Sequence, residues 1–334
     1  MTTLEDVEEI VKGMKKNKAP GLDGSTVEFF QATWSFMGLD ILEVIEESRR
    51  NKKVCLGLKS TFLTLIPKTS KAEDPQRFRP ISLCNFIYKI IATMIARRLK
   101  PLLPNIISPE QIGFVEGRQI LDELVTLQKL VHSLKVKKAA GMMVKLDLSN
   151  AYDKLSWEYL RTILRAYGFS PRWIEWISAM ISTPVLSIIL NGTPTSTFNS
   201  TRGLRKGDPL SPFLFIIVAE GLRRYIKKES QVSRIKGLRV WGNDLALTHQ
   251  QFVDDIMLFF QASLREARTM KEILDIFMQA SGTQINKEKS CTFFFNTPEN
   301  VKSYLSRIMG FSKCNLPTNY LGMPLVENPL KMAG

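Results

Sequence analysis

Three aspartates stand at the ends of two apolar segments of this sequence. Asp147 follows the run that begins at Met142, and the pair Asp254-Asp255 is bracketed by residues that favour strands. Acids at the ends of separate strands can converge at one edge of a sheet, where they repel unless cations neutralise them. Carboxylate oxygens suit Mg²⁺ or Mn²⁺, and two such ions can hold the attacking and leaving oxygens of an in-line phosphoryl displacement. The pair alone would also fit an ordinary solvated hairpin turn, so the third aspartate is what favours this chemistry.

A basic loop lies between these acids in the sequence. Residues 202–212 (RGLRKGDPLSP) combine three cations with two glycines and two prolines and lead into an apolar segment. Backbone exposed by glycine and the amino end of a helix both suit contact with phosphate or sugar. The same composition also fits a purely structural loop. The loop therefore agrees with a phosphate-bearing substrate without requiring one.

The charge balance of the chain is strongly basic. Its 334 residues include 46 Lys and Arg against 32 Asp and Glu, a formal net charge of +14. Such an excess points to a polyanion such as nucleic acid, or to an anionic membrane surface. The longest apolar run, Phe213 to Ala219, is too short to span a membrane, and the acidic amino terminus has no apolar signal core. We therefore expect an intracellular protein, in the nucleus or the cytoplasm, with no membrane partner.

Several other catalytic classes lack the residues they need. The chain has two histidines, His132 and His249, and four scattered cysteines with no C-x-x-C pair. This excludes imidazole-rich metal sites, argues against zinc ribbons and disulfide frameworks, and leaves a Ser-His-Asp triad few options. No Gly-Lys dipeptide occurs, so there is no P-loop. If the protein is an enzyme, carboxylates and lysines must carry the chemistry.

Strand and helix patterns alternate irregularly, which favours an α+β fold over a regular βαβ series. Apolar periodicity predicts helices over 5–16, 27–50, 86–103, 121–138, 157–167, 209–228 and 265–280. Strands are predicted over 60–67, 142–148 and 186–191, within 245–260, and at the end of 282–295. Asp147 is thereby expected at the end of a strand, and Asp254-Asp255 at a reversal between two strands.

Short motifs follow one another along nearly the whole chain. They are KAPGLDG (18–24), LIPK (65–68), RFRPISL (77–83), QIGFVEGR (111–118), DLSNAYD (147–153), the 202–212 loop, FVDD (252–255), SGTQINKEKS (281–290) and YLGMPL (320–325). In this order they resemble the reverse transcriptase domain of plant LINE-type non-LTR retrotransposons, with motifs A, B, C and D of the palm beginning at 147, 202, 252 and 281. One motif would be weak, whereas the ordered series is specific.

The resemblance implies a fold, which is an α+β right-hand polymerase with an antiparallel palm sheet packed on helices. The implied parts are an N-terminal extension preceding the fingers (1–60), fingers (61–140), palm (141–295) and the start of a truncated thumb or connection (296–334). Members of the family usually carry an endonuclease before this domain and further sequence after it. The resemblance therefore leads us to expect a fragment or a decayed genomic copy.

The resemblance also implies the catalytic residues. Asp147, Asp254 and Asp255 would form the acidic site, in which Asp147 and Asp254 hold two Mg²⁺ ions, with Mn²⁺ as the alternative. The carbonyl of Leu148 would add a metal ligand. Asp153 and Asp208 are expected to be structural partners of nearby loops instead.

Five residues would bind the incoming nucleotide by the same resemblance. Lys68 and Arg79 match residues that grip the triphosphate, and Tyr152 matches the aromatic residue that stacks under the sugar and excludes a 2′-hydroxyl. Lys206 would line the nucleotide pocket, and Lys289 would be the general acid for the leaving pyrophosphate. Core packing for Tyr152 and plain solvated charges for Lys68 and Arg79 are the simpler alternatives.

The implied function is RNA-directed DNA polymerase, a nucleotidyltransferase. Such an enzyme extends a primer 3′-hydroxyl on an RNA template by two-metal phosphoryl transfer. Its partners would be the RNA template, a DNA primer and deoxynucleoside triphosphates (dNTPs). No obligatory protein partner is readable from the sequence.

Two positions depart from the family pattern. Lys206 stands where the family usually has Gln, and an ammonium group donates hydrogen bonds but cannot accept them. Val253 replaces the Ala of the usual F-A-D-D. The first departure keeps an alternative open, a catalytically impaired retroelement remnant that only binds RNA. A group II intron-like maturase is a second alternative, although Tyr320-Leu321-Gly322 fits LINE elements better.

Overall fold

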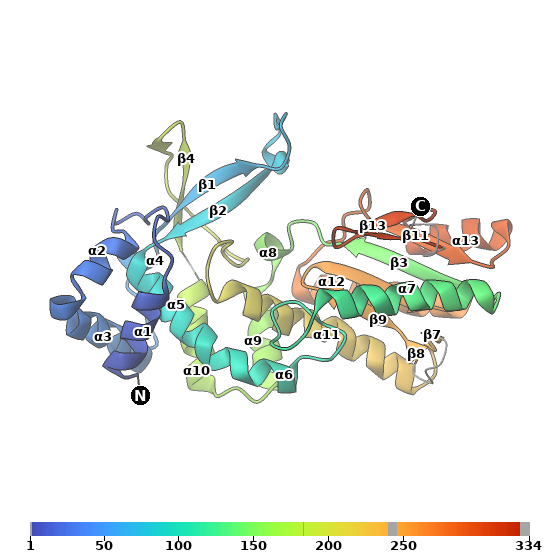
Figure 1. Cartoon of the computed structure of the whole chain (residues 1–334), viewed down its shortest axis with the longest axis horizontal. Helices are drawn as coiled ribbons and strands as arrows, with labels where there is room; N and C mark the ends of the chain where they lie inside the picture. Colours follow the sequence, from blue (N-terminus) through green and yellow to red (C-terminus); the bar gives the residue numbers. More distant parts are fainter. Residues whose placement is uncertain (1, 183, 240–245, 328–334) are drawn as a thin grey trace. The chain divides into compact units, whose positions relative to one another are not determined.

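The computed structural model describes residues 2–182, 184–239 and 246–327. The chain forms two compact units, each built from two separate stretches. Unit 1 is Met1–Leu102 with Tyr152–Phe215, and unit 2 is Leu103–Ala151 with Ile216–Gly334. Two helices run across the boundaries, α8 (Ala151–Lys154) and α11 (Ser211–Gln231). Helices and sheets occur in both units, which confirms the α+β class (Figure 1).

Unit 1 contains a group of amino-terminal helices and one sheet. Its helical elements are α1 (Leu4–Gly13), α2 (Val27–Ala32), α3 (Trp34–Asn51), α4 (Leu56–Lys59), η1 (Pro75–Arg77), α5 (Phe86–Leu99), η2 (Lys100–Leu102), α9 (Trp157–Ala166) and α10 (Pro171–Ile181). Its strands are β1 (Thr61–Pro67), β2 (Phe78–Cys84), β4 (Val185–Leu190), β5 (Thr193–Pro194) and β6 (Phe198–Asn199). Strand β1 pairs antiparallel with β2 and parallel with β4. The sheet therefore joins segments that lie more than a hundred positions apart in the sequence.

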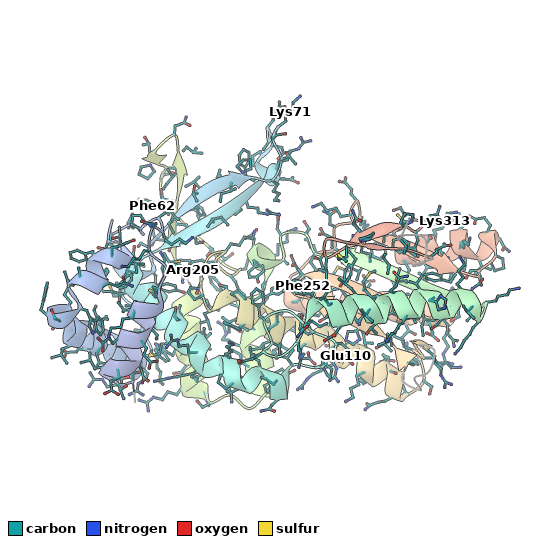
Figure 2. The ribbon with its side chains drawn as sticks, viewed as in Figure 1. Phe62, Lys71, Glu110, Arg205, Phe252 and Lys313 are labelled. Carbon is teal, nitrogen blue, oxygen red and sulfur yellow. The ribbon has the colours of Figure 1, made fainter. Side chains whose placement is uncertain are left out.

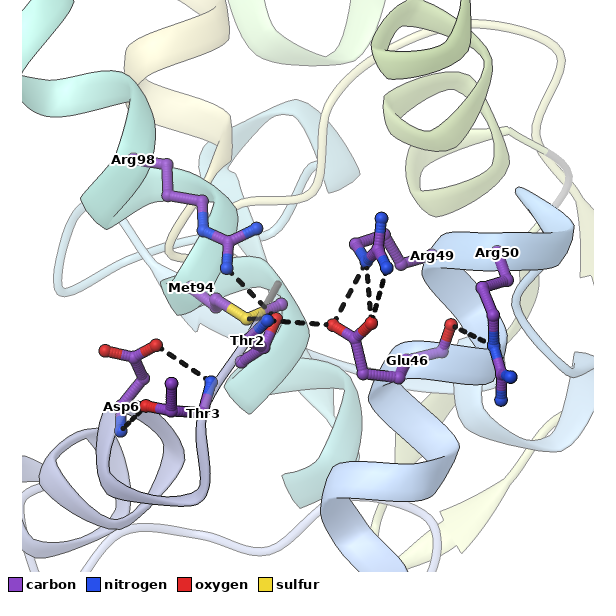
Figure 3. Close-up of polar contacts among 8 residues, drawn as sticks. All are labelled: Thr2, Thr3, Asp6, Glu46, Arg49, Arg50, Met94 and Arg98. Atoms are coloured by element: carbon purple, nitrogen blue, oxygen red, sulfur yellow. Dashed lines mark hydrogen bonds and ion pairs between the residues drawn. The ribbon is translucent and has the colours of Figure 1, made fainter.

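Polar contacts fasten the start of the chain to helices α3 and α5 (Figure 3). The Thr2 amide donates to Glu46 at 3.1 Å, and the Arg98 guanidinium donates to the Thr2 hydroxyl at 3.0 Å. Arg49 donates to the Glu46 carboxylate, and this hydrogen bond lowers the pKa of Glu46 to about 2. The segment that starts at Thr2 is thus part of the packed structure of unit 1.

One predicted helix is divided in the structure. The pattern over 27–50 predicted a continuous helix, but α2 ends and α3 begins at Thr33. The Thr33 hydroxyl donates back to the carbonyl of Phe29 at 2.8 Å. The Thr33 amide donates to the same carbonyl at 3.0 Å, so the helical bond pattern of α2 reaches Thr33. The backbone of Thr33 then leaves the helical conformation, with φ −97° and ψ 5°, and this separates α2 from α3.

Unit 2 contains the sheet that carries the predicted acids. Its strands are β3 (Gly141–Asp147), β7 (Leu238–Arg239), β8 (Ala246–Leu247), β9 (His249–Phe252), β10 (Asp255–Phe260), β11 (Cys291–Phe295), β12 (Ser312–Lys313), β13 (Thr318–Tyr320) and β14 (Met323–Leu325). Its helices are α6 (Leu103–Ile106), α7 (Ile120–Val136), α12 (Leu264–Ser281) and α13 (Glu299–Met309). The main sheet has the order β12-β11-β3-β10-β9. Strand β3 is therefore central, and β10 and β11 both pair antiparallel with it.

A buried cluster joins α7 to one face of this sheet (Figure 1). Leu127 and Leu130 of α7 pack in it with Met143 of β3 and Phe259 of β10. Tyr320 at the end of β13 belongs to the same cluster and is 1% exposed. Burial of such large apolar side chains contributes about 2 kcal/mol each, so this packing holds the central strands firmly.

The predicted four-part division stays a prediction. It follows the named parts of the resembled family, whereas the two units follow compactness, and residues 61–140 contribute to both. Positions 328–334 of the last predicted part lie outside the described residues. Among residues 2–182, 184–239 and 246–327, no helix combines the length and the apolar character needed to span a membrane.

Candidate active site

The three predicted acids lie together at one end of the main sheet of unit 2. Asp147 is the last residue of β3 and Asp255 is the first of β10, and the two are direct cross-strand partners. Asp254 precedes Asp255 in the tight turn between β9 and β10, because Phe252 pairs with Asp255 across it. Side chains directly opposite each other in an antiparallel pair lie on the same face. Two strands distant in sequence thus bring these carboxylates to one place.

The electrostatics of Asp255 reflect this crowding. Burial raises the pKa of the Asp255 carboxyl, and the charges of Asp254 and Asp147 raise it further. The charges of Lys145 and Lys289 act in the opposite direction. A cation placed among the three acids would relieve the same repulsion.

The acids suit a hard cation that is shared with a substrate. Among the described residues, no group of three His, Cys, Asp or Glu side chains gathers closely enough to hold a metal ion by itself. Mg²⁺ usually keeps several waters and binds through one or two carboxylates together with substrate phosphates. Asp147 and Asp254, with Asp255 alongside, supply oxygen ligands of that kind.

The segment 284–290 wraps around the end of β3. The Asn286 amide donates to the carbonyl of Asp147 at 2.8 Å, and the Asp147 amide donates to the Ser290 hydroxyl at 3.1 Å. Leu148 is buried and forms an isolated bridge with Ile285. Lys289 is exposed on this segment, and its charge lowers the pKa of Asp255. Lys289 is therefore within electrostatic reach of the acids, whereas the role predicted for the Leu148 carbonyl stays a prediction.

The predicted triphosphate contacts lie on the β1–β2 hairpin of unit 1. Lys68 follows β1, and its ammonium donates to the carbonyl of Gln76 at 2.8 Å. Arg79 is exposed on β2 opposite Ile66. Figure 2 labels Lys71 on the same projecting hairpin. Both Lys68 and Arg79 are exposed, and the triphosphate contacts predicted for them stay predictions.

Tyr152 packs within unit 1. Its ring stacks on Phe215 with the centroids 4.8 Å apart and an interplanar angle of 11°. Its carbonyl accepts a hydrogen bond from the Leu204 amide at 2.7 Å. The ring is therefore fixed in orientation, as both the sugar-stacking prediction and the packing alternative require.

Lys206 forms an ion pair with Asp153. The ammonium lies 2.6 Å from the Asp153 carboxylate, and both side chains are partly exposed. They line a cavity of about 220 Å³ together with Ser82, Arg202 and other residues of unit 1. The expectation that Asp153 is a structural partner of a nearby loop is confirmed.

Buried polar contacts hold the rest of the 202–212 loop. The Tyr88 hydroxyl donates to the Asp208 carboxylate at 2.7 Å, which confirms the structural role expected for Asp208. The Arg205 guanidinium lies 4.0 Å from the centre of the Tyr88 ring and donates to the carbonyls of Lys59 and Met180. Figure 2 labels Arg205 in this part of unit 1. The loop is thus built into the core of the unit.

Gly203 is required at the point where the loop meets residue 153. Its φ is +91°, a region that side chains disfavour, and a Cβ built there would lie 2.6 Å from the carbonyl oxygen of Asp153. The Gly203 carbonyl also accepts a hydrogen bond from the indole of Trp157 at 2.6 Å. The sequence therefore needs glycine here for close backbone approach.

Sequence reasoning missed one buried residue beside the acids. Gln111 belongs to the QIGFVEGR motif, yet no role was predicted for it. Its side-chain oxygen accepts hydrogen bonds from the amides of Gly113 and Val253, each at 3.0 Å. The only sequence signal was the motif itself, because a sequence does not show which distant backbone amide a glutamine meets.

Comparisons with known proteins agree with the motif series. The family described as reverse transcriptase (RNA-dependent DNA polymerase) matches residues 66–325. The chain is 31% identical over 86% of its length to the transposon TX1 uncharacterized 149 kDa protein of Xenopus laevis, covering 22% of that protein. It is 30% identical over 83% of its length to the Pol polyprotein from the type-2 retrotransposable element R2DM of Drosophila melanogaster, covering 25% of it.

A shorter plant protein is also similar. The uncharacterized mitochondrial protein AtMg01250 of Arabidopsis thaliana is 33% identical over 34% of this chain, which covers 91% of that protein. The chain spans about a quarter of the length of the two retroelement relatives described above. The match of the family to most of the chain nevertheless decides its membership. The chain belongs to the reverse transcriptase family of RNA-dependent DNA polymerases, as a domain of the kind found in non-LTR retrotransposons.

Proposed function

We propose that Asp147, Asp254 and Asp255 form the active site of this RNA-directed DNA polymerase. The observation that carries the proposal is the cross-strand pairing of Asp147 with Asp255, with Asp254 in the adjoining turn. This arrangement concentrates negative charge where the sheet ends. Burial raises the pKa of Asp255 most, and the charges of Asp254 and Asp147 raise it further. In a nucleic-acid polymerase, a local group of carboxylates binds the metal ions, while basic residues elsewhere bind the nucleic acid.

Asp147 and Asp254 would hold two Mg²⁺ ions, with Asp255 and the Leu148 carbonyl as further ligands and Mn²⁺ as the alternative. Bound there, the ions would lower the pKa of the primer 3′-hydroxyl and neutralise charge on the α-phosphate. The task of the chain's own residues is to keep the carboxylates oriented. Two hydrogen bonds hold the backbone of Asp147 for that purpose, one from the Asn286 amide to its carbonyl and one from its amide to the Ser290 hydroxyl.

The nucleotide contacts belong to the same proposal. Lys68 and Arg79 would grip the triphosphate, since Arg offers a planar fork and Lys a compact charge. Tyr152, held against Phe215, would lie under the sugar and exclude a 2′-hydroxyl. Lys206 would line the pocket with its charge balanced by Asp153, and Lys289 would protonate the leaving pyrophosphate.

We also infer the finer identity of the domain from the motif order. The series from KAPGLDG to YLGMPL supports a plant LINE-type element, and the similarity to the Arabidopsis protein agrees with it. The fold would be the right-hand polymerase with fingers and palm. The substrates would be an RNA template, a DNA primer and dNTPs.

Primer extension on an RNA template with dNTPs and Mg²⁺ tests this proposal. Asp254→Ala is expected to reduce extension by about 10³-fold or more, because metal-held charge supplies several kcal/mol of transition-state stabilisation. Asp275→Ala is the matched control, since this exposed acid of unit 2 pairs only with Lys271 among the described salt bridges. The control should extend primers like the wild type.

Two results would contradict the proposal. If the Asp254→Ala variant still extends primers, the assignment of the three acids to the active site is wrong. RNA binding by the wild type without extension would support the alternative of an impaired remnant. A gel-shift measurement on the same RNA distinguishes that remnant from an unfolded protein.

A further inference from the structure

The turn that carries Asp254 contains a residue in an unusual backbone conformation. Val253 has a φ of +60° and is 6% exposed. A positive φ at the first position of a two-residue hairpin turn is usually supplied by glycine, asparagine or aspartate. For a β-branched residue this region is a true outlier, which persists only where the surroundings impose it. Something near Val253 must therefore hold the turn.

Gln111 makes the contact that holds it. The Gln111 side chain is buried, 1% exposed, and its oxygen accepts from the amides of Val253 and Gly113 at 3.0 Å each. Both partners are donors, so the oxygen and not the nitrogen of the amide must face them. The Gln111 nitrogen has no hydrogen-bond partner among the described residues. The side-chain oxygen of Gln111 therefore makes both hydrogen bonds to the catalytic turn and its neighbouring segment.

The segment around Gln111 is itself fixed to strand β9. The Gln251 amide donates to the carbonyl of Glu110 at 2.8 Å, and the Ile112 amide donates to the carbonyl of Gln251 at 3.0 Å. In Figure 2 the labels Glu110 and Phe252 mark the two segments that these bonds join. The Gln111 side chain therefore starts from a backbone that already runs beside the catalytic hairpin.

A second layer of contacts holds this segment in place. The Arg118 guanidinium donates to the carbonyls of Ile107, Ser108 and Gln111. Ser108 in turn donates through its amide and its hydroxyl to the buried carboxylate of Glu220, at 3.1 and 3.0 Å. The position of the Gln111 oxygen is therefore determined by several independent contacts.

Gly113 leaves room for this arrangement. A Cβ built on Gly113 would lie 2.5 Å from a methyl group of Val253 and 3.2 Å from its amide nitrogen. Only glycine lets the 111–113 backbone approach Val253 so closely. The close contact between the 111–113 segment and Val253 therefore depends on both the Gln111 oxygen and the absence of a side chain at Gly113.

We propose that Gln111 is a positioning residue of the polymerase site, which holds Val253 in its left-handed conformation and thereby orients Asp254 and Asp255 beside Asp147. This inference rests on the proposed function of the three acids. Without the Gln111 oxygen, the Val253 amide would lose its buried acceptor and the turn would relax toward conformations that valine prefers. The carboxylates would then bind metal less well, although the rest of the sheet would remain.

Gln111→Met tests the proposal, because methionine keeps the length of the side chain but offers no comparable acceptor. We expect Mn²⁺ affinity, measured from the electron paramagnetic resonance signal of free Mn²⁺, to fall about fivefold. The Mg²⁺ concentration for half-maximal extension should rise by a similar factor. Hydrogen exchange at the Val253 amide should quicken at least tenfold.

Gln128→Met is the matched control. Gln128 lies on α7 in the same unit, and its amide group also makes two hydrogen bonds, both to the backbone of Val326. Its replacement removes a comparable pair of bonds away from the catalytic turn. We expect Mn²⁺ affinity and exchange at Val253 to stay as in the wild type.

Val253→Gly provides the rescue, since glycine adopts a positive φ without help. The double variant Gln111→Met/Val253→Gly should recover at least half of the lost Mn²⁺ affinity on a logarithmic scale. The proposal is overturned if the Gln111 and Gln128 variants bind Mn²⁺ alike, if exchange at Val253 is unchanged, or if glycine gives no recovery. If the wild type extends no primer, the proposed function fails while exchange and Mn²⁺ affinity still decide the role of Gln111.

Discussion

Glu123 is a buried acid of α7 that is close enough to Asp255 to feel its charge. It is 1% exposed, and its carboxylate accepts a hydrogen bond from the Tyr320 hydroxyl at 2.9 Å. Burial raises the pKa of Glu123 to about 7, and the charge of Asp255 adds to the rise while the Tyr320 hydrogen bond opposes it. The folded protein therefore keeps a proton on Glu123 at pH values where the unfolded chain has released it.

This proton makes the stability of the fold depend on pH. The folded pKa lies above the ordinary value of 4.5, so stability is fully present below that value and declines as pH rises toward about 7. Glu123→Gln should remove the decline. We expect the variant to gain up to about 3 kcal/mol in unfolding free energy at pH 8 relative to the wild type, and far less at pH 5.

Urea denaturation at pH 5 and pH 8 measures this effect. Glu158→Gln serves as the control, because Glu158 is an exposed acid paired with Arg161. This substitution should leave the difference in unfolding free energy between pH 5 and pH 8 almost unchanged. An equal difference in the wild type and in the Glu123 variant would show that Glu123 does not carry the proton.

At the scale of residues, the acids were predictable and their supports were not. Asp147, Asp254 and Asp255 stood out because carboxylates are rare beside apolar strand residues. Gln111 and Glu123 gave no such signal, since their importance comes from contacts with Val253 and Tyr320, which lie far away in the sequence. Such contacts exist only once the chain is folded.

The loop 202–212 is hydrogen-bonded to residues 152–155, which include most of the short helix α8. Their backbones are joined by hydrogen bonds from Gly203 to Leu155 and from Leu204 to Tyr152, at 2.8 and 2.7 Å. The ion pair of Lys206 with Asp153 is the side-chain link between the same two segments. The Asp153 carboxylate therefore balances the charge of Lys206.

A double-mutant cycle tests whether the two segments work as a pair. Asp153→Asn should raise the dNTP KM about tenfold in the Lys206 protein, because the unpaired ammonium is free to move within the cavity. In the Lys206→Gln background the same change should raise KM less than twofold, since Asn and Gln can hydrogen-bond while neither carries a charge. Measuring KM in all four proteins checks this coupling, and equal effects of Asp153→Asn in both backgrounds would disprove it.

At the scale of elements, strong apolar patterns were predictable. Strands β3 and β10 and helices α5, α7 and α12 match the predicted segments closely because long periodic runs determine them. Strand β2 was missed because Arg79 and Pro80 interrupt its pattern. Helix α10 was missed even though Ser170 and Pro171 form a helix start that could have been recognised.

The short strands β13 and β14 were also missed, for a different reason. They are three residues each, which is too short for periodicity to detect. Their place depends on Tyr320 and Leu325, which pack in the cluster formed by α7 and the sheet. Tertiary packing, and not local preference, makes these residues strands.

For the whole molecule, the net charge of +14 predicts how nucleic acid would bind. Cations that neutralise phosphates release counterions, so affinity should fall as salt rises. A protein that neutralises four phosphates would lose roughly a hundredfold in affinity between 50 and 200 mM salt. Titrating a labelled RNA–DNA duplex at several salt concentrations measures the slope.

The same titration with Asp254→Ala separates binding from catalysis. This variant lacks one acid but keeps every Lys and Arg, so it should show the same salt slope as the wild type. Affinity that does not change with salt would mean that the basic excess does not contact the duplex.

The division of both units between two stretches of chain has a consequence for biosynthesis. Strand β1 pairs in parallel with β4, and Thr61 lies opposite Leu186. During synthesis, β1 therefore has no parallel partner until residue 186 has been added to the chain. Unit 1 is complete only after Phe215, and by then Leu103–Ala151 of unit 2 has already been made without its sheet partners β10 and β11. Exposed strand edges in such a nascent chain favour misassembly. A ribosome that makes this protein must therefore carry two unfinished units at once, and a single-point truncation after residue 102 or 151 would release a chain in which neither unit is whole.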